Sequence, residues 1–188
     1  IDSATLLNKA LEVVEAHWLF DLQPEQIDVV IHPESIVHSC VEFRDGSLIA
    51  QMGCPDMTTP IAYALSYPHR SERNSDSLDL PALGQLTFRK LTGRFRRAVD
   101  LGFAAIRRGG AAGAVLNGAN EAAVEAFLAG RIPFGQIVDL VEETLNRARP
   151  IEEVTLESLR AADAAARRHV MRRVEALEAR PAARGRER

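Results

Sequence analysis

Apolar residues near the start of the chain recur at the spacing of an α-helix. Asp2 and Ser3 are residues that commonly cap a helix, and Leu7, Leu11 and Val14 follow three or four positions apart. Apolar side chains at this spacing line one side of a helix. The pattern therefore predicts a helix over residues 2–20 with a buried apolar stripe, to which Leu6 and Trp18 also belong by spacing.

A turn around Pro24 leads into runs with the composition of β-strands. These runs are residues 27–32, 35–43 and 47–52. Arg44-Asp45-Gly46 between the last two is a tight-turn signal. Residues 53–60 contain two prolines and are expected to form a loop, and a short helix is expected over 61–66. Residues 1–67 are therefore predicted to form part of an α/β domain, in which one helix accompanies a small β-sheet.

The pattern changes at residue 68. Residues 68–94 mix Ser, Asn, Asp, Pro and Gly with isolated apolar residues, which predicts an irregular connection. Helical periodicity then returns in four segments separated by Gly or Pro, at 95–108, 117–129, 134–147 and 156–179. Four helices with short connections predict an antiparallel bundle over 95–179. Residues 180–188 form a basic tail without core-forming residues, expected to be disordered. The predicted fold class is α+β.

Composition excludes several classes of protein. The formal charge is −3, so no basic field over the whole chain favours nucleic acid. No apolar run approaches the length of a membrane span. Cys40 and Cys54 are too few for a disulfide framework, which favours a cytoplasmic setting. The chain opens at Ile1 directly in a helix-start pattern, and we therefore expect a piece of a longer protein.

The first predicted helix carries the strongest candidate chemistry. Thr5, Asn8, Lys9 and Glu12 fall at positions i, i+3, i+4 and i+7 and would share one face. Lys and Asn near a helix start can hold a phosphate, and a carboxylate one turn later can bind a hard cation such as Mg²⁺ or Mn²⁺. On spacing alone, a solvated polar face explains the same residues and is the more common case.

Two histidines and a methionine are weaker candidates. His32 and His38 flank the turn between two predicted strands, and Met57 lies in the proline-containing loop. Structural histidines and packed methionines are more common than functional ones at such positions. The sequence contains no dinucleotide fingerprint, phosphate-binding loop or zinc-protease motif.

Longer motifs give these residues a context. The run D-S-A-T-L-L-N-K-A-L-E over 2–12 and E-A-H-W-L-F over 15–20 resemble the signature of the 1-deoxy-D-xylulose 5-phosphate reductoisomerase family. Further family segments follow in the same order: I-H-P-E-S-I-V-H-S over 31–39, D-G-S over 45–47, P-D-M-T-T-P-I over 55–61 and L-N-G-A-N-E over 116–121. Ala10, where the family often has Gly, and Cys54, where Glu is common, are departures outside the residues of interest.

The resemblance implies an enzyme of the non-mevalonate isoprenoid pathway. The family converts 1-deoxy-D-xylulose 5-phosphate to 2-C-methyl-D-erythritol 4-phosphate with NADPH and Mg²⁺ or Mn²⁺. The resemblance implies that Lys9 and Glu12 are catalytic, with Glu12 also a metal ligand, and that Met57 lies near the nicotinamide. The residues that it assigns to the phosphorylated sugar substrate are Ser3, Asn8, Lys9, Ser35 and His38.

The family pattern also sets limits on this chain. The NADPH-binding domain and the other metal-binding carboxylates of the family precede the matching segment, so we expect these 188 residues alone to be inactive. A homodimer is expected for the full-length enzyme, with no nucleic-acid or membrane partner. One alternative is a non-enzymatic helical interaction module. A metal-dependent phosphatase is disfavoured, because a second set of Asp and His ligands is missing from the sequence.

Overall fold

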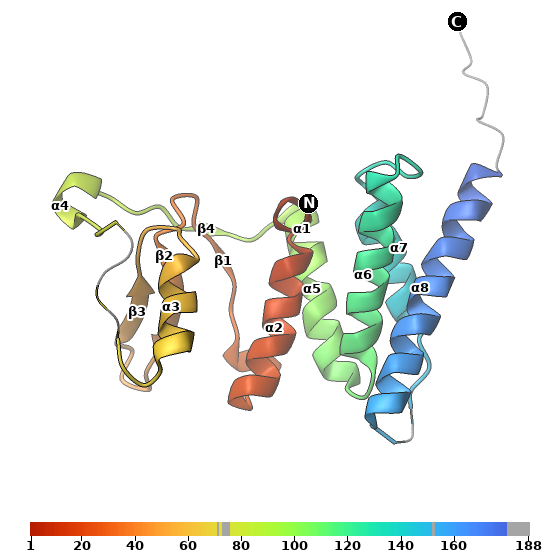
Figure 1. The fold of residues 1–188 in the computed structure, drawn as a ribbon, viewed down its shortest axis with the longest axis horizontal. Helices are drawn as coiled ribbons and strands as arrows, with labels where there is room; N and C mark the ends of the chain where they lie inside the picture. Colours follow the sequence, from red (N-terminus) through yellow and green to blue (C-terminus); the bar gives the residue numbers. More distant parts are fainter. Residues whose placement is uncertain (71, 73–75, 152, 180–188) are drawn as a thin grey trace, which may run out of the picture. The chain divides into compact units, whose positions relative to one another are not determined.

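The chain forms two compact units. The computed structural model describes residues 1–70, 72, 76–151 and 153–179. One unit combines Ile1–Asp28 with the chain from Thr92 onward, and the other is Val29–Leu91 (Figure 1). The predicted tail over 180–188 lies outside the described residues.

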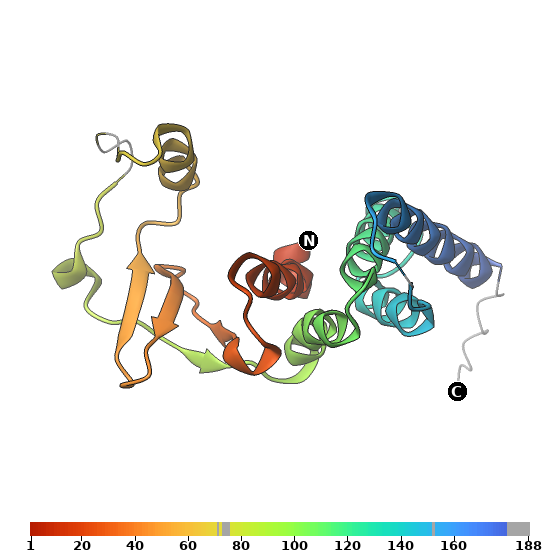
Figure 2. The ribbon, with the colours of Figure 1, turned by 90° about the horizontal axis from the view of Figure 1, so that it is seen from below.

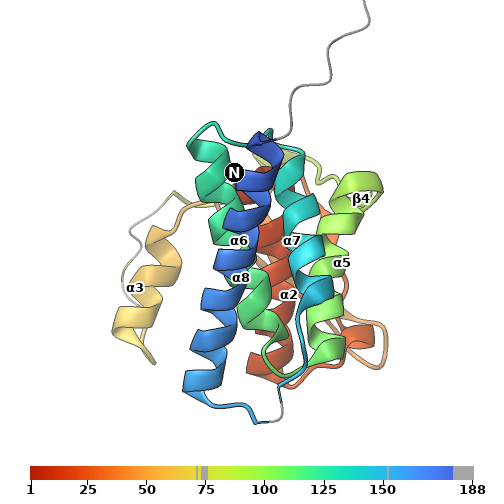
Figure 3. The same ribbon diagram turned by 90° about the vertical axis from the view of Figure 1, so that its right-hand side faces the viewer.

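The first unit is helical throughout. Its elements are α1 (Asp2–Thr5), α2 (Leu7–Phe20), the 3₁₀ helix η1 (Pro24–Gln26), α5 (Gly93–Arg108), α6 (Ala112–Leu128), α7 (Gln136–Arg147) and α8 (Leu156–Glu178). Helix α6 packs against α8, α7, α5 and α2, and α2 lies along α5 (Figures 2 and 3). The four predicted C-terminal helices are confirmed as a bundle, although α6 begins five residues earlier than the predicted 117.

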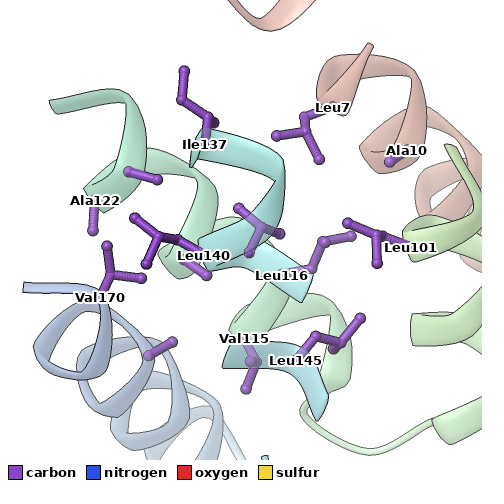
Figure 4. Close-up of a cluster of buried hydrophobic side chains, with 14 of the residues drawn as sticks. Leu7, Ala10, Leu101, Val115, Leu116, Ala122, Ile137, Leu140, Leu145 and Val170 are labelled. Carbon is purple, nitrogen blue, oxygen red and sulfur yellow. The ribbon is translucent and has the colours of Figure 1, made fainter. Parts of the chain in front are cut away.

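One hydrophobic core joins these helices. Leu7 and Ala10 of α2 belong to the same buried cluster as Leu101 of α5, Leu116 of α6 and residues of α7 and α8 (Figure 4). Fully burying a side chain of leucine size stabilises a fold by about 1.5–3 kcal/mol. Helix α2, which the sequence groups with the following strands, therefore draws its burial from the helical unit.

The predicted helix over 2–20 is wrong in one respect. It is broken at Leu6, whose φ of 63° and ψ of 18° lie in the left-handed region. Both Leu6 and Leu7 contact the core as a result, with Leu7 fully buried. At the other end of α2, Trp18 is 67% exposed and does not continue the buried stripe that periodicity predicts.

The second unit is built from short strands and loops. Its elements are β1 (Val30–Ile31), β2 (Val37–Glu42), β3 (Leu48–Met52), α3 (Thr58–Ser66), α4 (Leu80–Leu83) and β4 (Arg89–Lys90). β2 and β3 form the predicted antiparallel hairpin, with Gly46 at a φ of 82° in its turn. β1 pairs with β4, with Val30 opposite Lys90.

Three sequence predictions for this unit need correction. Within the predicted strand over 27–32 only Val30–Ile31 pair as a strand, and α3 begins at Thr58, inside the predicted loop over 53–60. The predicted connection over 68–94 contains α4 and β4. Residue Asp79 caps α4 by accepting the Ala82 N–H at 3.1 Å, and β4 exists because it pairs with β1 about sixty residues earlier, which local periodicity does not reveal.

The α+β class is confirmed. Within the described part of residues 95–179 every regular element is a helix, and strands occur only in the second unit. None of the helices that the structure describes combines the length and apolar character needed to cross a membrane.

The α2–α5 contact yields the first prediction. A Cβ atom at Gly102 would lie 2.3 Å from the Ala10 carbonyl oxygen, so Gly102→Ala forces the two backbones apart. We expect the free energy of unfolding to fall by about 2–3 kcal/mol, measured by urea denaturation of the 188-residue chain. Gly135→Ala is the matched control, because its Cβ meets nothing within 4 Å. Equal urea midpoints for the two variants would show that the close approach is not required.

Candidate functional site

The break at Leu6 rearranges the polar face predicted at the start of the chain. Thr5 would share that face in a continuous helix, but its side chain is buried, with 5% of the residue exposed. The Leu7 N–H donates to Thr5 Oγ1 at 3.3 Å. The predicted four-residue face is therefore reduced to Asn8, Lys9 and Glu12, which follow one another on α2 at i, i+1 and i+4.

Lys9 and Glu12 form an ion pair on this face. Lys9 Nζ donates to Glu12 Oε2 at 2.6 Å, and the two side chains are 38% and 50% exposed. An exposed pair of this kind contributes about 0–1 kcal/mol to stability. The two charges compensate each other and both remain accessible from solvent.

Asn8 lies deeper than its neighbours. It is half-buried, and its Oδ1 atom is shielded from solvent without a hydrogen-bond partner among the described residues. A buried amide oxygen left without a donor costs about 1–3 kcal/mol.

Ser3 occupies the short helix on the other side of the break. It is exposed and belongs to α1, a separate helical turn, rather than to the helix that carries Lys9. Its position relative to Asn8 is thus set by the backbone at Leu6.

Ser35 and His38 belong to the second unit. Ser35 has a φ of 52°, and its N–H donates to the His32 carbonyl at 3.1 Å, which closes the turn before β2. The β2–β3 register shifts between Val37 and Ser39, so His38 is the extra residue of a β-bulge and is exposed. Bulges are over-represented next to active sites because they re-aim a side chain.

Met57 directly precedes α3 and is 68% exposed. The loop before it is held by Asp56, whose carboxylate accepts the Thr58 N–H at 2.9 Å and the Thr58 hydroxyl at 2.8 Å. These two hydrogen bonds lower the pKa of the Asp56 carboxyl. The thioether is thus presented to solvent from a locally ordered loop.

His32 has the contacts of a structural histidine, as the sequence favours. Its Nδ1 lies 2.8 Å from the Thr87 carbonyl oxygen, and its ring stacks on Phe88. Glu34 Oε2 is 3.1 Å from the same nitrogen, and the Thr87 hydroxyl lowers the pKa of the Glu34 carboxyl. These contacts tie the end of β1 to the segment before β4.

The described residues contain no group of three or more His, Cys, Asp or Glu side chains arranged to hold a metal. Glu12 is thus a single carboxylate rather than a member of a preformed cluster. In the first unit, Asn8, Lys9 and Glu12 lie within one stretch of α2. In the second unit, Ser35 lies in the turn just before β2 and His38 near the start of that strand. The sequence analysis places Thr5 on the polar face and does not predict its burial, although Thr is a recognised residue at a helix start.

Comparisons with known proteins place this chain in a family. The model of the DXP reductoisomerase C-terminal domain family matches residues 52–169. The chain belongs to this family. Among curated relatives, the 1-deoxy-D-xylulose 5-phosphate reductoisomerase of Aromatoleum aromaticum is 51% identical over 167 residues, covering 89% of this chain and 41% of that protein. That of Geobacillus kaustophilus is 52% identical over 171 residues, or 90% and 45%.

Solved structures give the same result. The 1-deoxy-D-xylulose 5-phosphate reductoisomerase of Zymomonas mobilis in complex with NADPH superposes with a TM-score of 0.85 at 43% identity, over 93% of this chain and 46% of that one. A DOX-P reductoisomerase in complex with NADPH, fosmidomycin and magnesium gives 0.87 at 41% identity, over 96% and 46%. The chain thus spans less than half the length of these relatives. The family resemblance and the fold are confirmed, and the roles of individual residues stay predictions.

The exposed face of α2 should be dispensable for folding. We expect Lys9→Met to change the free energy of unfolding by less than about 0.5 kcal/mol, because its ion pair is exposed. Leu7→Ala, two residues earlier on the buried side of α2, should cost about 2–5 kcal/mol. Urea denaturation of the 188-residue chain compares them, and a loss for Lys9→Met as large as that for Leu7→Ala would mean that Lys9 serves the fold.

Proposed function

We propose that this chain supplies the C-terminal part of a 1-deoxy-D-xylulose 5-phosphate reductoisomerase. The complete enzyme would convert 1-deoxy-D-xylulose 5-phosphate to 2-C-methyl-D-erythritol 4-phosphate, in the non-mevalonate route to isoprenoid precursors. Membership of the family, together with the solvent-accessible Lys9–Glu12 pair on α2, is the observation that supports it. The alternative of a helical interaction module is weaker, because the matching family is a domain of an enzyme.

The substrate phosphate is the ligand we propose for Ser3, Asn8 and Lys9. The Lys9 ammonium supplies a countercharge, and the Asn8 amide supplies a directed donor. The start of α2 adds the positive end of a helix dipole, which favours an anion. Lys9 is in addition a proposed catalytic residue, because its charge lies beside the reacting part of a substrate bound at this face.

Glu12 is the proposed metal ligand of this chain. Its carboxylate is half exposed and has the hard oxygen donors that Mg²⁺ and Mn²⁺ prefer. Mg²⁺ is usually held by one or two carboxylates together with substrate oxygens and water, so a single Glu fits as one ligand of a shared site. A cation held there would supply Lewis-acid polarisation of adjacent substrate oxygens. Before a cation binds, the Lys9 ammonium compensates the negative charge of Glu12.

The second unit contributes three further proposed residues. Ser35 and His38 would contact the substrate from the turn and bulge at the start of β2. Met57 would pack near the nicotinamide of NADPH, a role that suits an accessible and polarizable thioether. In functional terms, residues 1–67 would belong to the catalytic domain and 95–179 to the helical domain. For the complete enzyme we propose a cytoplasmic homodimer without nucleic-acid or membrane partners.

These 188 residues by themselves should not turn over substrate. The sequence has no dinucleotide fingerprint, and the described residues offer Glu12 no companion ligands. We expect no NADPH oxidation when the chain is mixed with 1-deoxy-D-xylulose 5-phosphate, NADPH and Mn²⁺, followed at the absorbance of NADPH. Turnover by this chain, abolished by a chelator, would contradict the proposal that it is one part of the catalytic unit.

Glu12 can be tested in a chimaera in which this chain replaces the matching 41% of the Aromatoleum aromaticum enzyme. Glu12→Gln should lower kcat at least about 100-fold, because the amide keeps the shape but loses the charge that holds a cation. Raising the Mn²⁺ concentration should restore part of the loss. Glu125→Gln, an exposed position on α6, is the control with expected normal turnover. Equal turnover in the two variants would remove Glu12 from the metal site.

A further inference from the structure

The break between α1 and α2 lies directly before the residues proposed to bind the substrate. We infer that Thr5 is a positioning residue: its hydroxyl fixes the start of α2 and thereby the placement of Asn8 and Lys9 relative to Ser3. This inference rests on the proposed function. Thr5 would not contact the ligand itself. It would act through its hydrogen bond with the backbone N–H of Leu7.

The burial of Thr5 shows what the break does. Successive residues of an α-helix are rotated by about 100°, so in an unbroken helix Thr5 would lie within about 60° of Asn8, Lys9 and Glu12. Glu12 is exposed and Asn8 and Lys9 are half-buried, yet only 5% of Thr5 is exposed. The left-handed conformation of Leu6 therefore turns α1 so that Thr5 enters the core while Ser3 stays exposed.

Two contacts hold this conformation. A left-handed backbone is unfavourable for a leucine and persists only where its surroundings impose it. Leu6 packs against the core next to the fully buried Leu7. The Leu7 N–H, which would need the carbonyl of residue 3 in a continuous helix, donates instead to Thr5 Oγ1 at 3.3 Å. The hydroxyl of Thr5 thus replaces a backbone acceptor and makes the break compatible with burial.

The break also creates a helix start at the proposed substrate site. The N–H groups of the first helical turn, at Leu7, Asn8 and Lys9, have no carbonyl one turn earlier within α2. The Thr5 hydroxyl oxygen accepts the hydrogen bond of the first of these groups, the Leu7 N–H. Without the Thr5 hydroxyl, the backbone would relax toward a continuous helix and carry Ser3 around the helix axis away from Asn8.

The test compares three substitutions in the Aromatoleum aromaticum chimaera. Thr5→Val keeps the shape of the side chain and removes the acceptor, and Thr5→Ser keeps the acceptor. Thr144→Val is the matched control, because Thr144 is equally buried in α7, with 4% of the residue exposed, and its hydroxyl donates to the Leu140 carbonyl at 2.7 Å. The measurements are KM and kcat for 1-deoxy-D-xylulose 5-phosphate, with thermal unfolding by circular dichroism.

Thr5→Val should raise KM about tenfold with a smaller fall in kcat, because phosphate contacts are used in both the bound substrate and the transition state. Thr5→Ser should restore KM to within about twofold of the unsubstituted chimaera. Thr144→Val should lower the thermal midpoint as Thr5→Val does while leaving KM unchanged. A normal KM for Thr5→Val, or an equal rise for Thr144→Val, would overturn the positioning role.

One further variant separates this inference from the proposed function. Lys9→Met should raise KM in the same chimaera whether or not Thr5 positions it. If Lys9→Met raises KM and Thr5→Val does not, the positioning role is wrong and the proposed function stands. If neither variant changes KM, or the unsubstituted chimaera is inactive, the proposed function is contradicted and the inference falls with it.

Discussion

The candidate site depends on the close packing of α2 against α5. Ala10 is completely buried, and its carbonyl lies so near Gly102 that a single added carbon would collide with it. Small residues at a helix crossing let two backbones approach, and an interior packed to crystal-like density leaves little freedom to shift them. Because Lys9 immediately precedes Ala10, the contact that anchors the helix also fixes the point at which the Lys9 side chain leaves it.

The two sides of α2 therefore serve different purposes. Leu7, Ala10 and Val13 are buried and hold the helix in place. Lys9 and Glu12 face water, where an ion pair adds little stability and its charges remain available to ligands. This division explains how a helix can be built firmly into a core and still offer a cation and an anion one turn apart.

The second unit is shaped by local hydrogen bonds more than by a core. Ile36 and Leu91 are the buried hydrophobic side chains among its described residues. Its turns are instead fixed by Asp45 and Asp56, each of which accepts the N–H and hydroxyl of the residue two positions later. The Ser47 hydroxyl and N–H lower the pKa of the Asp45 carboxyl. The loop ordered by Asp56 presents Met57 without requiring extensive burial.

The sequence by itself determined the α+β class, the β2–β3 hairpin and the four helices of the bundle, because these follow from local periodicity and turn residues. Its longer motifs also identified the family. Only the tertiary structure decided that α2 packs with the bundle, that Leu6 breaks the first helix and buries Thr5, and that β4 exists as the partner of β1. A left-handed leucine and a two-residue strand leave no periodic signal, because distant packing and pairing, rather than local preference, stabilise them.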